Sequence, residues 1–137
     1  MGEYAVNSNA TERQIVGEVD IYKVYRLTRV QFPEGAGKVF MYPGFIKHLQ
    51  KNHPGRFEMY YHLIPSIILE PDYIGQNPKE LESIELYKRV NDVLLLAIKF
   101  DAKRGYLFLA SFYELDNWKK KIKKRLRTGR IVPYSKA

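Results

Sequence analysis

Three histidines, His48, His53 and His62, are the side chains of this sequence best suited to proton transfer. An imidazole titrates near pH ~6.5, so it can accept a proton and return it close to neutral pH. Cleavage of RNA without a metal needs such groups, one to deprotonate the 2′-hydroxyl and one to protonate the leaving 5′-oxygen. His48 and His53 bracket the end of an expected helix. The alternative is that each histidine is a surface residue without a catalytic role.

Two polar residues interrupt apolar runs that we expect to be strands. Ser111 lies within the run at 106–115, where a hydroxyl needs a hydrogen-bond partner if it is buried. It could hold a phosphate oxygen in a cleft, or it could bond to neighbouring backbone. Lys99 follows the apolar run at 93–98 and could stabilise the charge of a pentavalent phosphorane, or lie at a solvent-facing strand end.

Several other chemistries lack their usual residues. The chain has no cysteine, which excludes disulfides, thiolate metal sites and a thiol nucleophile. No His-Glu-x-x-His motif occurs, and His48 and His53 are not spaced four apart as zinc ligands on a helix would be. The glycine-containing segment 35–38 lacks the spacing of a phosphate-binding loop. We therefore expect neither a metal nor a cofactor.

The charge of the chain indicates a polyanionic partner. The formal net charge is +8, and segment 119–130 is dense in Lys and Arg and contains no acidic residue. The expected nucleic-acid-binding residues are Lys119, Lys120, Lys123, Lys124, Arg127 and Arg130, together with Arg104 in a hairpin loop. The alternative is a solvated surface. The 11 tyrosines could stack on unpaired bases, although most occupy positions compatible with a core.

The pattern of apolar residues predicts the elements that would position these groups. Residues 1–13 resemble a flexible polar arm, and 14–137 form one domain. Helices are expected near 21–27, 43–51 and 56–69, the last kinked at Pro65, and a basic helix at 114–128 is expected to end at Gly129. Strands are expected at 38–42, 73–75, 83–88, 92–100 and 106–112. The predicted fold is α+β, with N-terminal helices packed on a roughly four-stranded antiparallel sheet and a basic C-terminal helix.

Four stretches together resemble the phage-associated branch of the barnase–EndoU–colicin–RelE nuclease superfamily. They are IVGEVD (15–20), GKVFMYPGFIKHLQKNHP (37–54), IPSIILEPDYIG (64–75) and YLFLASFYEL (106–115). The resemblance covers about 15–130. It implies helices packed on a four-stranded antiparallel sheet, with a ribonuclease-like site across the sheet that comprises His48, His53, Lys99 and Ser111. Glu58, Glu85 and Glu114 are each possible partners of a catalytic histidine.

The resemblance therefore predicts a metal-independent endoribonuclease that forms a 2′,3′-cyclic phosphate, with RNA such as tRNA as substrate. The expected location is the cytoplasm of a host bacterium or the virion, with an immunity or virion protein as a further partner. Residues 1–14 lack the apolar core of a signal peptide, and no apolar run is long enough to span a bilayer, so no membrane partner is expected. The alternative function is a non-catalytic module that binds nucleic acid or protein through the same basic surface.

Overall fold

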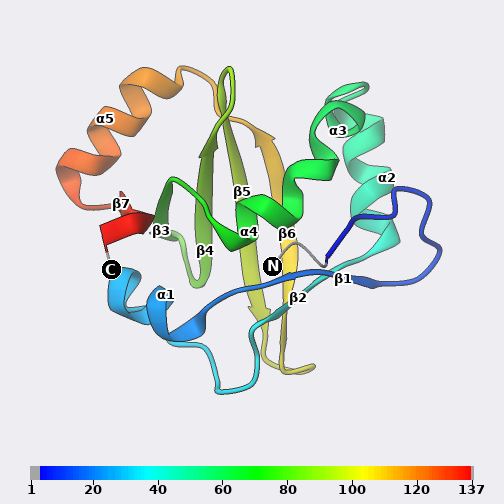
Figure 1. Cartoon of the computed structure of the whole chain (residues 1–137), viewed down its shortest axis with the longest axis horizontal. Helices are drawn as coiled ribbons and strands as arrows, with labels where there is room; N and C mark the ends of the chain where they lie inside the picture. The colour runs from blue at the N-terminus through cyan, green and yellow to red at the C-terminus, as the bar shows by residue number, and fades with distance from the viewer. Residues whose placement is uncertain (1–3, 137) are drawn as a thin grey trace.

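The computed structural model describes residues 4–136 and contains a seven-stranded sheet within them (Figure 1). Its strands are β1 (Gln14–Glu18), β2 (Lys38–Met41), β3 (Tyr73–Asn77), β4 (Glu80–Arg89), β5 (Val93–Asp101), β6 (Tyr106–Glu114) and β7 (Ile131–Pro133). The spatial order is β1-β2-β6-β5-β4-β3-β7, and β2 and β6 form a parallel pair while the other pairs are antiparallel. The α+β class is confirmed. The expectation of about four antiparallel strands was wrong, because short β1 and β7 extend the sheet and β2 joins it in parallel.

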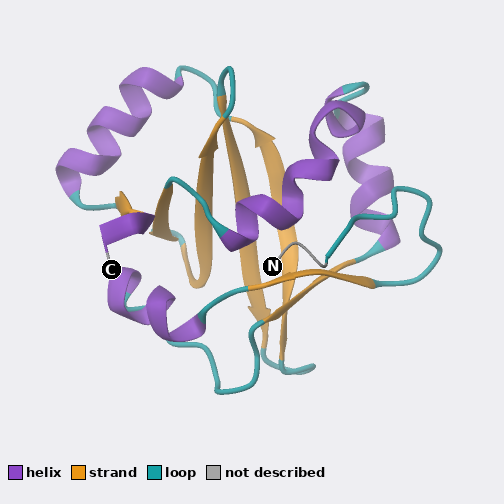
Figure 2. Ribbon diagram, viewed as in Figure 1, coloured by secondary structure: helices purple, strands orange, loops and turns teal. Residues whose placement is uncertain are grey.

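Five α-helices accompany the sheet within the described residues (Figure 2). They are α1 (Ile21–Thr28), α2 (Pro43–Asn52), α3 (Arg56–Tyr60), α4 (Ile64–Leu69) and α5 (Trp118–Thr128), with short 3₁₀ turns at Tyr61–Leu63 and Tyr134–Lys136. The Asp20 carboxylate caps α1 by accepting a hydrogen bond from the Lys23 backbone N–H at 3.1 Å. Gly129 ends α5 with a left-handed backbone, φ 80°.

Two predicted helices differ in the structure. The expected helix at 56–69 is interrupted at Tyr61–Leu63, and Pro65 lies in the first turn of α4, where a missing N–H costs no hydrogen bond. The expected helix at 114–128 begins only at Trp118, because the chain continues as β6 to Glu114. The chain also enters the fold through a strand, β1, rather than through a helix.

One face of the sheet carries the larger hydrophobic core. Alternate side chains of β4 and β5, including Leu86, Leu96 and Ile98, are buried against Ile67 of α4 and Val24 of α1. Figure 1 shows α4 crossing this face of the central strands. No helix within residues 4–136 combines the length and apolar character needed to cross a membrane.

The opposite face is covered only in part. There α5 inserts Ile122 into a smaller core that includes Tyr87, Leu95 and Ile131. Beyond α5, several side chains on this face are half-buried or exposed. They are Phe40 of β2, Lys99 of β5, and Tyr106, Phe108, Ser111 and Tyr113 of β6. We call this part of the sheet the open face.

Gly75 has no side chain, which allows β7 to pair closely with β3. A Cβ atom at this position would lie 2.2 Å from the Arg130 carbonyl oxygen, a distance at which real atoms clash. Gly75 is paired with Ile131 on one side and with Glu85 on the other. The glycine therefore brings the segment that carries Arg130 to the strand next to Glu85.

Candidate functional site on the open face

Glu85, in the middle of β4, is a buried carboxylate with only 4% of its surface exposed. The Tyr87 hydroxyl donates a hydrogen bond to it at 2.9 Å, and Arg130 Nη2 donates to its two oxygens at 2.9 and 3.2 Å. A buried charge of this kind is stable only when it is paired and hydrogen-bonded. Arg130 Nε is also buried and has no hydrogen-bond partner among the described residues.

Tyr87 extends this network toward α5. Its hydroxyl accepts a hydrogen bond of 2.8 Å from Arg125 Nη1 while it donates to Glu85. Burial raises the pKa of Tyr87 above its ordinary value, and the negative charge of Glu85 raises it further. The phenol therefore stays protonated and can donate. We call Glu85, Tyr87, Arg125 and Arg130 the central cluster.

Strand register places the central cluster beside β6 residues of the open face. Glu85 is paired with Ala97, and Ala97 with Ser111, so the three side chains form one row across β4, β5 and β6. The small Ala97 side chain separates Glu85 from the serine hydroxyl. Two residues along β6, Tyr113 is 40% exposed. Burial of part of its ring raises the pKa of Tyr113, and Glu85 raises it further, so this phenol also keeps its proton.

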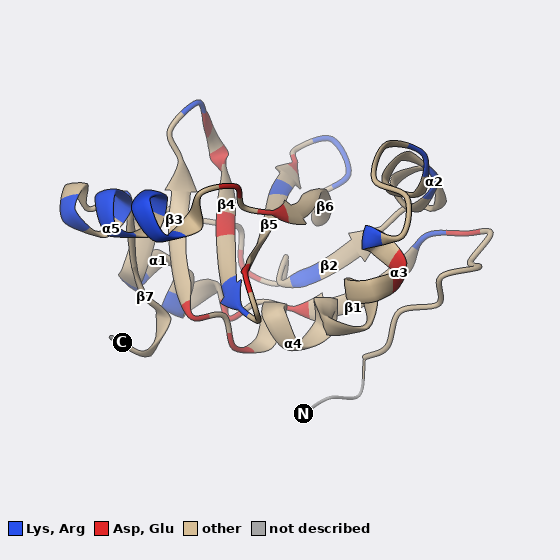
Figure 3. Cartoon of the chain, turned by 90° about the horizontal axis from the view of Figure 1, so that it is seen from above, with Lys and Arg blue, Asp and Glu red and all other residues tan. Residues whose placement is uncertain are grey.

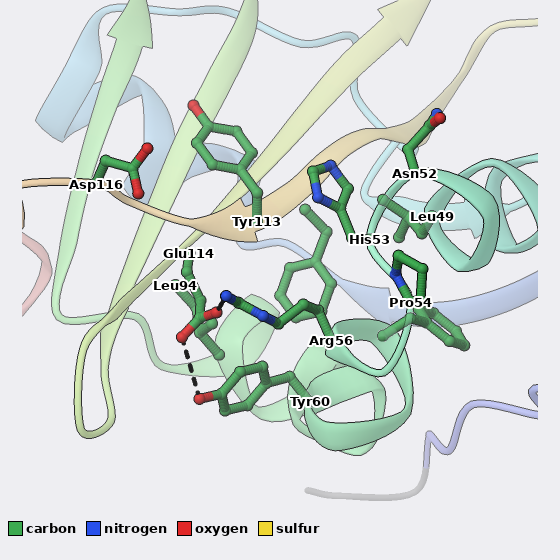
Figure 4. A pocket seen from close by; sticks show the side chains of 12 residues that line it. Leu49, Asn52, His53, Pro54, Arg56, Tyr60, Leu94, Tyr113, Glu114 and Asp116 are labelled. Atoms are coloured by element: carbon green, nitrogen blue, oxygen red, sulfur yellow. Dashed lines mark hydrogen bonds and ion pairs between the residues drawn. The ribbon is translucent and has the colours of Figure 1, made fainter.

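A pocket of about 510 Å³ lies between β6 and the α2–α3 helices. It is lined by Leu49, Asn52, His53, Pro54, Arg56, Phe57, Tyr60, Leu94, Phe112, Tyr113, Glu114 and Asp116 (Figure 4). Arg56 forms an ion pair with Glu114, and the Tyr60 hydroxyl donates to the same carboxylate at 3.3 Å. Glu114 thus ties α3 to the end of β6. His53 and Tyr113 both line this pocket, which places a histidine near the end of β6 from which Tyr113 comes.

The structure brings together some of the residues singled out from the sequence. Lys99 and Ser111 lie on the open face, where Lys99 forms an ion pair with Glu80. His53 lines the pocket that Tyr113 also lines. His48 is separate from this group, because its exposed ring hydrogen-bonds to the Asn52 amide at 3.0 Å and does not line the pocket.

The basic helix α5 borders the open face and is blue along most of its length in Figure 3. Its exposed cations are Lys119, Lys120, Lys123, Lys124 and Arg127, and Trp118–Thr128 contains no acidic residue. The other two expected phosphate-binding residues have partners within the chain. Arg130 holds Glu85, and Arg104 forms a 3.1 Å ion pair with Asp101.

The sequence analysis missed Tyr87, Tyr113 and Arg125, and it named Glu85 only as one of three possible carboxylates. One signal for Glu85 was present, since it is a charged residue inside an alternating apolar strand, SIELY at 83–87. Its partners lie two and 45 residues away along the chain, so only strand register reveals the cluster. Within residues 4–136, no group of three or more His, Asp or Glu side chains could hold a metal ion.

Residues 14–124 match the model of a family described as phage-Barnase-EndoU-ColicinE5/D-RelE like nuclease 3. No curated protein and no solved structure matches the chain. The matched segment contains the pocket, Glu85, Tyr87 and the open face, whereas Arg125 directly follows its end and Arg130 lies six residues beyond it.

Proposed function

The chain belongs to this phage nuclease-like family, and from that premise we propose that it is an endoribonuclease that leaves a 2′,3′-cyclic phosphate. In this reaction the 2′-hydroxyl of RNA attacks the adjacent phosphorus and the 5′-oxygen departs. The nucleophile belongs to the substrate, so the protein must supply proton transfer and charge stabilisation, and no metal is required. The observation that carries the proposal is the hydrogen-bonded central cluster beside Ser111 and Tyr113, next to an acid-free basic helix.

We assign the phosphate to the row beside the central cluster. The Ser111 hydroxyl would donate to a non-bridging oxygen, while Arg125 and Lys99 would stabilise the negative charge of the phosphorane. Arg125 suits this role because Tyr87 holds its guanidinium through one nitrogen, which leaves other donors for a ligand. Arg130 pairs with Glu85 and holds its side chain in position.

We assign proton transfer to His53 and Tyr113. His53 would take the proton of the 2′-hydroxyl, and Tyr113 would donate to the departing 5′-oxygen. Burial and the Glu85 carboxylate raise the pKa of Tyr113 overall, and the nearby positive charges of Arg125 and Arg130 would offset part of that effect and stabilise the tyrosinate left behind. His48 is the rival base, and it is the weaker choice because it does not itself line the pocket, although its ring is hydrogen-bonded to Asn52, which does.

The test is cleavage of total RNA in EDTA, followed by mass analysis of the ends. We expect 2′,3′-cyclic phosphates, and we expect no cleavage at a position that carries a single 2′-deoxy nucleotide. His53→Ala should lower the rate by about 10²–10⁴-fold, while His48→Ala should remain close to the unchanged protein. Cleavage at the deoxy position, or equal rates for all three proteins, would overturn the assignment.

A second candidate function is non-catalytic binding of nucleic acid. The observation that favours it is α5 itself, because five exposed cations with no acid in the helix attract phosphates whether or not chemistry follows. Binding that weakens steeply with salt, without strand scission in the EDTA assay, would support this function over the first.

A further inference from the structure

One end of the open face carries four half-buried aromatic rings: Phe40, Tyr42, Tyr106 and Phe108. Phe40 and Phe108 are partners in the parallel β2–β6 pair, and Tyr106 lies two residues earlier on the same side of β6. The Phe40 and Tyr106 ring centroids are 4.4 Å apart, and the hydroxyls of Tyr42 and Tyr106 are hydrogen-bonded. We call these four residues the aromatic end.

The aromatic end does not belong to either hydrophobic core. None of its four rings packs with the core clusters on the two faces of the sheet. The group that covers two of the rings is a cation, since the Arg13 guanidinium lies 4.5 Å from the Phe40 centroid and 5.1 Å from that of Tyr106. Large aromatic side chains held at a surface without a core to complete are typical of binding sites.

Cations lie near the rings. Besides Arg13, two cations that are ion-paired within the chain are close by: Lys99, paired with Glu80, is the cross-strand partner of Phe108, and Arg104, paired with Asp101, precedes Tyr106 by two residues in the hairpin loop. Lys38 is exposed on β2, two residues before Phe40. Flat π-faces next to several cations are complementary to nucleobases next to phosphates.

We propose that the aromatic end stacks unpaired bases, so that the protein selects single-stranded RNA. This inference rests on the proposed RNA substrate and specifies which form of RNA is taken. Duplex RNA hides its base faces, whereas a single strand can lay them on aromatic side chains. Strand β6 leads from Tyr106 to Tyr113 over roughly 23 Å, at ~3.3 Å for each residue. Bases held at the aromatic end would therefore guide the following phosphates to Ser111 and the central cluster.

The test measures binding without chemistry. A fluorescent 2′-O-methyl oligonucleotide of about ten nucleotides has no free 2′-hydroxyl, so its anisotropy reports affinity alone. The variants Phe40→Leu and Tyr106→Leu keep apolar volume and remove the π-face, and Tyr106→Phe keeps the ring. The matched control is Tyr22→Leu, a 61% exposed tyrosine on α1, which packs on the opposite face. Thermal unfolding of each variant establishes that it is folded at the assay temperature.

We expect each leucine variant on the open face to bind the single strand roughly 5- to 100-fold more weakly, with Tyr106→Phe and Tyr22→Leu within about twofold of the unchanged protein. The unchanged protein should prefer this strand to a duplex of the same length. Equal affinity for all folded variants, or a variant effect confined to self-association in sedimentation, would overturn the proposal. Cleavage and stacking fail independently: cleavage with unaltered oligonucleotide binding refutes only the aromatic end, and ring-dependent binding without cleavage refutes only the nuclease.

Discussion

The two faces of the sheet use the same strands for opposite purposes. On the face covered by α4 and α1, residues such as Leu86 and Leu96 are buried among aliphatic side chains. On the other face, the intervening residues of β4 are Glu85 and Tyr87, held by two arginines from the end of the chain. Because side chains alternate along a strand, one strand can stabilise the fold and carry chemistry at neighbouring positions. In the proposed function, the residues that stabilise the fold and the residues that carry chemistry therefore alternate along the same strand.

The largest loss of stability is expected at Arg130, because this residue neutralises the buried Glu85 carboxylate on the open face. Replacing it with alanine leaves Glu85 buried without its cation, which should lower the free energy of unfolding by about 3–5 kcal/mol. Urea denaturation measures this loss. The double variant Glu85→Gln with Arg130→Met should recover much of it, because no charge remains buried. If the single and double variants have the same free energy of unfolding, the uncompensated charge of Glu85 does not cause the loss of stability.

Two substitutions, one on each face, should have opposite effects on stability and on RNA cleavage. Leu96→Ala removes aliphatic contacts at a fully buried position and should cost about 2–5 kcal/mol, with RNA affinity unchanged while the protein is folded. Ser111→Ala, on the half-buried open face, should change stability by less than about 0.5 kcal/mol but slow RNA cleavage. The division of stability and RNA binding between the two faces would be contradicted if Ser111→Ala unfolds the protein. It would also be contradicted if Leu96→Ala weakens RNA binding in the folded state.

Alkaline pH should lower the free energy of unfolding because of Tyr87. Its raised pKa means that the folded protein keeps a proton which the unfolded chain releases near pH ~10. The stabilisation is complete below pH ~10, and unfolding becomes easier by up to ~1.4 kcal/mol for each further pH unit. Stability curves between pH 9 and 11 should therefore be flatter for Tyr87→Phe. An identical slope in both proteins would show that Tyr87 titrates as it does in the unfolded chain.

The smallest effect on stability is expected on α5. Lys123→Gln with Lys124→Gln should leave the unfolding free energy within about 0.5 kcal/mol, because both side chains are exposed. If both contact phosphates, the slope of log affinity for single-stranded RNA against log salt should fall by about 0.7 for each lysine. Lys47→Gln with Lys51→Gln on α2 is the matched control and should keep the original slope. Equal salt-dependence slopes in the two double variants would show that Lys123 and Lys124 of α5 do not contact RNA phosphates.

Local patterns predicted the elements well and the pairing between them poorly. The spacing of Ile46 and Leu49 indicated α2, and the alternation around Glu85 indicated β4, since both signals depend only on neighbouring residues. The strand β7 has three residues and exists only because β3 lies beside it, so no local pattern could reveal it. The same limit applied to the site. Ser111 and Lys99 stood out as polar residues in apolar runs, but the contact of Glu85 with Arg130 depends on β7 and on the glycine at position 75.

The margins of the sheet have a consequence for how this chain could misassemble. The long apolar strand β5 occupies the middle of the seven, and the outermost strands are irregular: β1 contains a bulge between Ile15 and Gly17, and β7 is short and includes Pro133. Such edges offer a poor template for the growth of cross-β fibrils. At the β7 margin, a second chain could add to the sheet only after β7 detached. That step would separate Arg130 from Glu85, so the proposed ribonuclease activity should disappear before any fibril forms there.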